Sequence, residues 1–200
     1  MKQILVVGED ALSCAIGERL VAEGLPGWSL AKASVNTRGI TKLVPALPRY
    51  FQQAQHVQPV LCIADTDGQC PVELVSTWMP HGWPQAFLFR LAVSEAESWL
   101  LSDRRGAADF FGMPEAKIPR TPDLLPDPKR EVLRLARIST IRTIRQEVVS
   151  SLDFNKPGVG YNTHLCRFVV QYWRANRART RSTSLDKALT RIAEFGAKFD

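Results

Sequence analysis

Short apolar runs alternate with amphipathic stretches through the first half of the chain. The runs at 3–7, 60–64 and 85–93 are too short for helices and predict strands buried on both faces. A looser alternation at 28–35 predicts one more strand. Since strands and helices alternate, we expect an α/β fold in which helices cover both faces of a parallel sheet.

Helix signals in this half come from caps and breakers. Residues 11–24 predict a helix with Asp10 as its N-cap and Gly24 as its end. Pro71 suits the first position of a helix over 71–79. We expect residues 39–56 to be helical in separate pieces, because the stretch is interrupted by Pro45 and Pro48.

The second half has a different organisation. Residues 118–128 contain four prolines and predict a linker or an extended wrap. A helix is expected within 162–181, and a last one over 184–195 with a serine N-cap. We therefore divide the chain into an α/β part, 1–117, and a mainly helical basic part, 118–200, packed on it. The first of these helices has an apolar stripe formed by Leu165, Phe168, Val169, Tyr172 and Trp173.

Acidic residues follow three of the predicted strands. Glu9 and Asp10 follow the first, Asp65 and Asp67 the central one, and Glu95 and Glu97 the strand at 85–93. In a parallel sheet these strand ends lie on one edge, where α/β proteins bind ligands. Along an extended chain Asp65 and Asp67 point to the same side, and their carboxylates repel unless a cation lies between them. Carboxylate oxygens are the ligands that Mg²⁺ prefers.

Each acid also has a structural interpretation. The sequence around Asp65 and Asp67 is typical of a turn, and an acid after the first strand favours a helix N-terminus. Ser94 and Glu97 fit a capping box, while Asp103 is expected at the surface. These alternatives stay open at the level of sequence.

Charge is unevenly distributed along the 200 residues. Residues 1–119 carry 10 Lys/Arg against 12 Asp/Glu, whereas 120–200 carry 16 against 8. A basic second half favours a polyanionic partner, although arginine-rich helices can also present an ordinary solvated face. We expect nucleic-acid contacts from two groups of arginines, one within a helix after the linker and one at seven-residue spacing: Arg130, Arg134, Arg137 and Arg167, Arg174, Arg181.

Composition excludes several classes of protein. The four cysteines have no paired spacing that would indicate zinc or disulfides, and no apolar run is long enough to span a membrane. The N-terminal apolar stretch is too short for a signal peptide, so we expect a cytoplasmic protein. No phosphate-binding loop of the G-x-x-x-x-G-K-[ST] type occurs, so any ATPase activity requires another chain.

The acids also carry a resemblance to a known fold. A glutamate after the first strand and a D-x-D after a later one resemble the Toprim signature of topoisomerases, bacterial primases and OLD-family nucleases. Over most of the chain, "LCIADTDGQCP", "AVSEAESWLLSDRRGAADFFG" and "NKPGVGYNTHLCRFVVQYW" resemble a bacterial Toprim-like family of unknown function. The resemblance implies a Toprim-like, Rossmann-like sheet with Glu9, Asp65 and Asp67 as metal-site carboxylates and Glu95 and Glu97 as family acids. We expect Glu95 and Glu97 to assist at the same metal site and include them among its candidate ligands. Because the first loop reads "GEDAL", either Glu9 or Asp10 could be the essential acid.

These observations favour Mg²⁺- or Mn²⁺-dependent hydrolysis of nucleic-acid phosphodiesters by an endonuclease or nickase, with catalysis by Glu9, Asp65 and Asp67. The resemblance further implies a separate ATPase partner and a role in phage defence. The alternative is a non-catalytic nucleic-acid-binding or regulatory subunit with a weak metal site. A topoisomerase needs more domains than this length allows, a primase lacks its zinc cysteines, and a small-molecule phosphohydrolase leaves the basic half unexplained.

Overall fold

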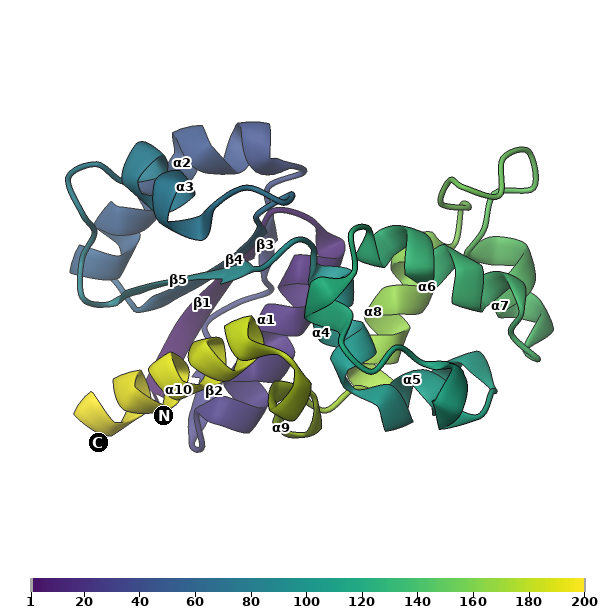
Figure 1. The fold of residues 1–200 in the computed structure, drawn as a ribbon. Helices are drawn as coiled ribbons and strands as arrows, with labels where there is room; N and C mark the ends of the chain where they lie inside the picture. Colours follow the sequence, from purple (N-terminus) through teal and green to yellow (C-terminus); the bar gives the residue numbers. More distant parts are fainter. Residues whose placement is uncertain (1, 200) are drawn as a thin grey trace.

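A parallel sheet lies at the centre of the computed structural model, which describes residues 2–199 (Figure 1). Its strands are β1 (Lys2–Gly8), β2 (Trp28–Leu30), β3 (Val35–Asn36), β4 (Val60–Asp65) and β5 (Phe87–Ala92). The order is β2-β1-β4-β5, and β3 also pairs with β1. The predicted strand at 28–35 is therefore two short strands, separated by a bend over 31–34.

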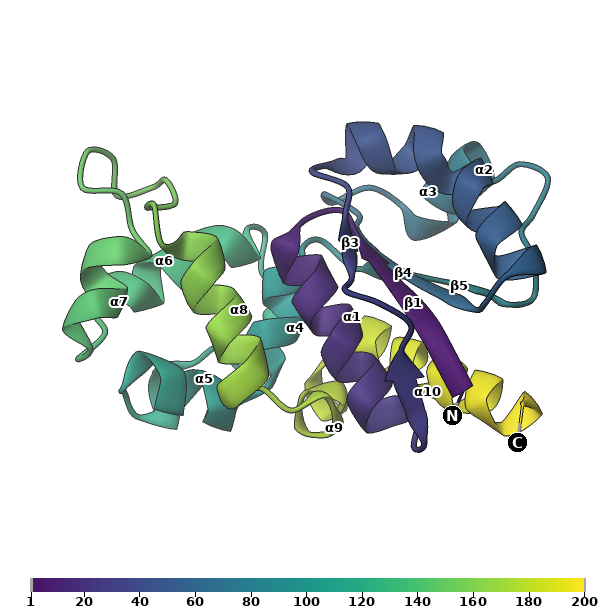
Figure 2. The ribbon, with the colours of Figure 1, turned by 180° about the vertical axis from the view of Figure 1, so that it is seen from behind.

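Two layers of helices cover the sheet, as the sequence predicts (Figures 1 and 2). Residues alternate along β1, so that Ile4 and Val6 face one apolar cluster while Leu5 and Val7 face the other. The first cluster includes α1 (Ala11–Gly24) and α10 (Thr183–Lys198), and the second includes α2 (Ile40–His56). Helix α3 (Pro71–Trp78) lies on the same face as α2.

Helix α2 is continuous through Pro45 and Pro48, so the expected break into pieces is wrong. Each proline removes one backbone hydrogen bond and normally bends or breaks a helix. Leu43, Leu47 and Tyr50 lie on the side that packs on the sheet and are buried there. This burial outweighs the local preference of the two prolines, because each large apolar side chain contributes about 1.5–3 kcal/mol.

The second half of the chain is helical and packs beside the sheet and along α1. Helix α8 lies alongside α1, and α10 returns to cover β5 and α1 (Figures 1 and 2). One apolar cluster joins side chains of β1 and α1 to side chains from α4 through α10, so the core is shared between the two halves. The remaining helices are α4 (Ala96–Ser102), α5 (Arg104–Phe111), α6 (Pro128–Arg137), α7 (Arg142–Glu147), α8 (Tyr161–Gln171) and α9 (Ala175–Ala178), with short 3-10 turns at Glu115–Lys117, Pro122–Leu124 and Arg179–Arg181.

The helix expected within 162–181 ends at Gln171, and this changes the arrangement of the arginines. Arg167 lies on α8, Arg174 precedes α9, and Arg181 lies in a 3-10 turn. They therefore share no helix face. The prediction that their seven-residue spacing places them on one face of a single helix is wrong. Trp173 contributes to the break, since its side chain is fully buried and donates a 2.9 Å hydrogen bond from Nε1 to the carbonyl oxygen of Trp99.

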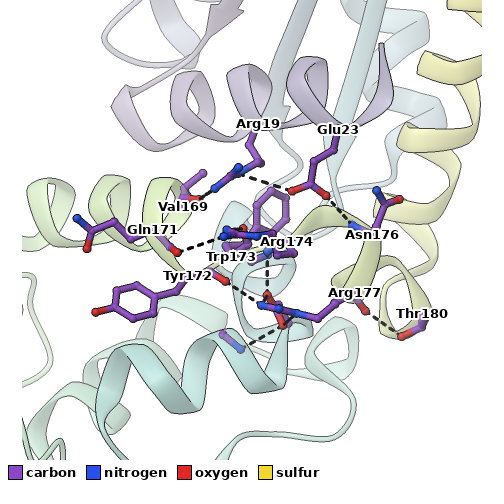
Figure 3. A network of polar contacts seen from close by, with 12 residues as sticks. Arg19, Glu23, Val169, Gln171, Tyr172, Trp173, Arg174, Asn176, Arg177 and Thr180 are labelled. Carbon is purple, nitrogen blue, oxygen red and sulfur yellow. Dashed lines mark hydrogen bonds and ion pairs between the residues drawn. The ribbon is translucent and has the colours of Figure 1, made fainter. Parts of the chain in front are cut away.

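Asp103 stabilises the same break and is not a surface residue. It is only 1% exposed, and its carboxylate accepts hydrogen bonds from the backbone N–H groups of Gly106 and Arg174 and from two guanidinium nitrogens of Arg177. Figure 3 shows the surrounding network, in which Arg19 of α1 also reaches the backbone oxygen of Val169. The carboxylate thus joins α5 to the start of α9.

The serine predicted to be the N-cap of the last helix, Ser184, does not cap α10. The N-cap is Ser182, whose hydroxyl accepts from the N–H of Leu185, while Ser184 accepts a 2.7 Å hydrogen bond from Trp99 Nε1. Within residues 2–199, the structure contains no helix with the length and apolar character needed to cross a membrane.

We expect Asp103→Ala to lower the free energy of unfolding by about 3 kcal/mol or more, because it removes four hydrogen bonds to a buried carboxylate. Urea unfolding monitored by circular dichroism measures this change. Glu194→Gln breaks the exposed ion pair with Arg191 and should change stability by less than about 1 kcal/mol. Equal effects of the two substitutions would contradict the role assigned to Asp103.

Candidate functional site

Glu9 and Asp65 meet at the edge where the parallel strands end. The strand β1 ends at Gly8 and β4 at Asp65, and these strands are direct neighbours in the sheet. The backbone N–H of Asp65 donates a 3.3 Å hydrogen bond to Oε2 of Glu9. The two acids, 56 positions apart in sequence, are therefore brought together by strand pairing.

Both carboxyl groups are held in surroundings that disfavour their charge. The pKa of Glu9 is raised to about 7, mainly by burial and in part by the carboxylates of Asp10 and Asp67, while the hydrogen bond from Asp65 and the positive charge of Lys129 oppose the rise. Burial, followed by the negative charges of Glu9 and Glu97, raises the pKa of Asp65 well above its usual range. In addition, the buried Oδ1 of Asp65 has no hydrogen-bond donor among the described residues.

Asp10 and Glu9 have different local roles. Oδ1 of Asp10 accepts a 2.7 Å hydrogen bond from the N–H of Ser13, so Asp10 is the N-cap of α1, as predicted. Glu9 instead directs Oε2 toward the end of β4. Of the two acids in the first loop, Glu9 is the one hydrogen-bonded to the neighbouring strand.

Asp67 lies in a turn, and the assumption of an extended chain through it is wrong. Strand β4 ends at Asp65, and Asp67 has a φ of +47°, followed by Gly68 at +75°. The N–H of Asp67 bonds to the carbonyl oxygen of Ser94, and the hydroxyl of Thr66 accepts from the N–H of Ser94. The turn after β4 is thus joined to the turn after β5, and Asp67 is exposed above it.

Glu97 is buried beneath this edge and does not form the predicted capping box. The N-cap of α4 is Glu95, which makes no side-chain capping bond, and Ser94 has a φ of +66°. Glu97 is 3% exposed, and its Oε1 accepts a 2.7 Å hydrogen bond from the hydroxyl of Tyr161 on α8. Burial raises the pKa of Glu97, while Lys129 and Tyr161 oppose that rise.

Lys129 supplies a positive charge to this cluster, and the sequence analysis missed it. Its Nζ lies 3.7 Å from Oε1 of Glu95 and 3.9 Å from Oε1 of Glu97, and its backbone N–H donates a 2.8 Å bond to Oε2 of Glu95. Neighbouring carboxylates raise the pKa of Lys129 despite its burial. The sequence contained one indication of this role. A lysine in the first turn of a helix is disfavoured by the positive end of the helix dipole, so its position there indicates a nearby acid that compensates its charge.

The five acids do not form a ready-made metal centre. Within residues 2–199, no three His, Cys, Asp or Glu side chains are grouped so that they could hold a metal ion. Glu95 and Glu97 are engaged by Lys129, and Asp67 lies in the exposed turn. Magnesium binding by Glu9, Asp65 and Asp67 therefore stays a prediction.

The exposed arginines of α6 lie on the same helix as Lys129. Lys129 is in the first turn of α6, and Arg130, Arg134 and Arg137 follow it along the helix. Arg134 forms two 2.7 Å hydrogen bonds with Glu131, whereas the guanidinium of Arg137 lies 4.6 Å from the ring centre of Phe154. Two cavities, of about 380 and 530 Å³, share Arg137 and Phe154. The exposed Phe154 was missed by the sequence analysis, because nothing in its local pattern distinguishes it from a core residue.

The second group of arginines is engaged mainly within its own segment. Nε of Arg167 donates to Oε1 of Gln171, and the guanidinium of Arg174 donates to the carbonyl oxygen of Trp173. Arg181 is exposed. A role of these three arginines in nucleic-acid binding stays a prediction, although they do not form a common surface on one helix.

Comparisons of the chain with protein-family models, with curated proteins and with solved structures found no match. The α/β sheet and the helical second half follow from the structure itself, and the Toprim-like resemblance stays a prediction.

Glu9→Gln should make stability less dependent on pH. The pKa of Glu9 is about 4.3 in an unfolded chain and rises to about 7 on folding. Between these two pH values Glu9 is protonated in the folded state and ionised in the unfolded state. Stability of the metal-free protein therefore falls as the pH increases from about 4.5 to 7.

This decline should be smaller in Glu9→Gln and also in Asp65→Asn, and Asp65→Asn should melt at a higher temperature than the original protein at pH 8. Thermal unfolding in a chelating buffer at several pH values measures both effects. Glu73→Gln, at an exposed position, is the control and should retain the full decline. An unchanged slope in both site variants would contradict the environment described for these carboxyls.

Proposed function

We propose that the chain hydrolyses nucleic-acid phosphodiester bonds in a metal-dependent reaction, as a Toprim-type endonuclease or nickase. The observation that carries the proposal is the pairing of Glu9 with Asp65 at the edge where the strands end, with a buried Asp65 oxygen that has no donor among residues 2–199. An oxygen in this state costs about 1–3 kcal/mol if nothing binds it. A cation with an affinity for oxygen ligands would remove that cost.

The residues present have the right chemistry for Mg²⁺ or Mn²⁺, since hard cations bind carboxylate oxygens. Glu9 and Asp65 would hold such an ion, and Asp67 would join them after a small movement of its exposed turn. The bound ion would lower the pKa of a water molecule and stabilise negative charge on the phosphate. The three acids fit as a set of oxygen ligands, with their final arrangement formed on binding.

The protein's own groups supply the remaining chemistry. Glu9 would act either as a ligand of the ion or as the general base. Its pKa of about 7 without a metal suits the second role, in which it takes a proton from the attacking water while Asp65 and Asp67 hold the ion. The ammonium of Lys129 is partly exposed, and it would offset charge on the scissile phosphate. Glu95 and Glu97 hold Lys129 in position, which is the assisting role that we assign to them.

The basic face of α6 continues from this site and would bind the nucleic-acid backbone. Lys129 and Arg137 are eight residues apart on one helix, which corresponds to about 12 Å along its axis. Arg130, Arg134 and Arg137 would contact phosphates, and the exposed ring of Phe154 offers a surface on which a base can stack. The substrate would thus extend from the carboxylates along α6 toward Phe154.

A second function is favoured by the position of Lys129. Its ammonium already compensates the acids with which it is paired, and no metal-binding group is preformed within residues 2–199. A protein arranged in this way can bind nucleic acid along α6 without cleaving it. The alternative is therefore a binding or regulatory subunit in which Lys129 replaces the cation.

Partners beyond nucleic acid rest on the resemblance alone. Because OLD-like nucleases combine an ATPase module with a Toprim module and this chain has no phosphate-binding loop, we propose a separate ATPase partner and a role in phage defence.

Purified protein should nick supercoiled plasmid in Mg²⁺ or Mn²⁺, and Asp65→Ala should lower the rate at least about a hundredfold, as expected for loss of a metal ligand. Gel electrophoresis of plasmid over time measures the rate. The control is Glu194→Ala, which changes an exposed acid of α10 outside the carboxylate cluster and outside α6. Tight binding without cleavage in any divalent metal would select the regulatory subunit, whereas cleavage that persists in Asp65→Ala would contradict the proposed site.

Reversing the charge of Arg130 and Arg137 to Glu should weaken nucleic-acid binding for all sequences alike. Each lost phosphate contact should reduce the slope of log affinity against log salt by about 0.7–0.9. Arg49 and Lys198 are exposed on α2 and α10, so their reversal to Glu makes the same change in net charge outside α6. Fluorescence anisotropy at several salt concentrations compares the two variants. An equal loss in both would show that α6 has no special role.

A further inference from the structure

The strand β5 lies at an open edge of the sheet, since no strand within residues 2–199 pairs with its outer side (Figure 1). In a parallel ladder, alternate residues direct their backbone groups toward the neighbouring strand. The carbonyl oxygen of Ala92 accepts from the N–H of Thr66, so the even-numbered residues of β5 face β4. The N–H and carbonyl groups of Phe89 and Leu91 therefore point away from the sheet, and among the described residues they have no hydrogen-bond partner.

A cavity of about 490 Å³ leaves this edge accessible. Three successive residues of β5, Phe89, Arg90 and Leu91, line it, so the cavity lies along the unpaired edge of the strand. Figure 1 shows this edge between α3 and α10. The lining residues from these two helices are Pro71, Val75, Thr183, Ser184 and Lys187. The edge and the two helices form a groove, which we call the β5 groove, and an extended peptide can enter it and continue the sheet as an added strand.

The two sides of the β5 groove differ in chemistry. Val75 of α3 and Trp83 of the following loop supply apolar surface, and Trp83 is 41% exposed, which is unusual for a tryptophan without a partner. Arg90 lies on the opposite face of β5, where Leu88 packs in the same apolar cluster as α10, and the exposed Lys187 belongs to α10 itself. Within the described part of the chain, neither Arg90 nor Lys187 forms an ion pair.

The net charge of the β5 groove is positive. Asp123 is the one acid among its lining residues, and this carboxylate accepts a 3.0 Å hydrogen bond from the N–H of Thr183 at the start of α10. Farther along α10, Arg191 and Glu194 form their own ion pair at 2.8 Å and add no net charge. The groove thus offers a cationic side to an acidic group and an apolar side to an aliphatic one.

We propose that the β5 groove binds an extended segment of a partner protein in which apolar residues alternate with acidic residues. The backbone of the segment pairs with the N–H and carbonyl groups of Phe89 and Leu91. Successive side chains of an extended chain point to opposite sides, so the apolar ones meet Val75 and Trp83 while the acidic ones meet Lys187. The proposal is independent of the reaction assigned to the carboxylate site.

A second copy of the chain suits this edge less well. If two β5 strands paired antiparallel about a twofold axis, Phe89 of one copy would pair with Leu91 of the other, and Arg90 would lie opposite its counterpart. Like charges directly opposite each other destabilise a pair of strands. The charge of the groove therefore favours an acidic segment over self-association.

Fluorescence anisotropy of labelled peptides with the full chain tests the proposal. The first probe is a peptide of about eight residues in which aspartate alternates with valine, and the second has lysine in place of aspartate. We expect the aspartate peptide to bind at least about tenfold more tightly than the lysine peptide, because only the first complements the cationic side of the groove.

N-Methylated probes separate backbone pairing from general attraction. One version of the aspartate peptide carries methyl groups on the aspartate nitrogens, and the other carries them on the valine nitrogens. Since the N–H groups of alternate residues point to opposite edges of a strand, one version should lose about tenfold or more in affinity and the other should retain it. Binding should also slow amide hydrogen exchange at Phe89 and Leu91 about tenfold or more.

Two substitutions examine the sides of the groove. Lys187→Glu should weaken binding of the aspartate peptide about tenfold and strengthen binding of the lysine peptide, whereas Trp83→Ala should weaken both. The matched control is Lys198→Glu, which makes the same change in net charge at the other end of α10 and should leave both affinities within about twofold. Thermal melting of each variant shows whether a loss of binding reflects unfolding.

Failure of the aspartate peptide to bind, or equal binding of the aspartate and lysine peptides, would overturn the proposal. So would full affinity in both N-methylated versions, because the backbone of β5 would then take no part. A dimer that is detected by light scattering and dissociated by the peptide would assign the edge to a second copy instead. Because Trp83 and Lys187 are exposed, their variants keep the test independent of the core.

Discussion

The ion-pair cluster of Lys129 with Glu95 and Glu97 determines how the two halves of the chain meet at the edge of the sheet. A buried glutamate such as Glu97 requires a partner, and the structure provides both the ammonium of Lys129 and the hydroxyl of Tyr161. These partners come from α6 and α8 of the basic half. The need to compensate a buried charge therefore brings the arginines of α6 next to the acids of the strand ends.

A second polar centre fixes the course of the chain farther from the site. The carboxylate of Asp103 binds the N–H of Arg174 and the guanidinium of Arg177, while the indole of Trp173 is buried against Trp99. Together they end α8 and turn the chain back, so that α10 can cover β5 and α1. This return path also brings Thr183 and Lys187 to the cavity beside β5.

Local patterns were sufficient for much of the α/β half. The alternation of apolar runs and capped helices predicted β1, α1, β4, α3 and β5, because strands buried on both faces and helix caps such as Asp10 depend on neighbours in sequence. The proximity of Glu9 and Asp65 also followed from sequence, since parallel strands end on one edge. Local preference was misleading in α2, where burial of Leu43, Leu47 and Tyr50 outweighs two prolines.

The sequence by itself therefore determined the sheet, its acid-bearing edge and the uneven charge. Tertiary structure alone decided how these acids are used: Asp67 lies in a turn with a left-handed backbone conformation, and Glu97 is buried against Tyr161, 64 positions later in the chain. The break after Gln171 and the burial of Asp103 also depend on contacts about 70 residues apart. Such contacts leave no periodic signal, because the burial and pairing of a charge are settled by residues that meet only after the chain has folded.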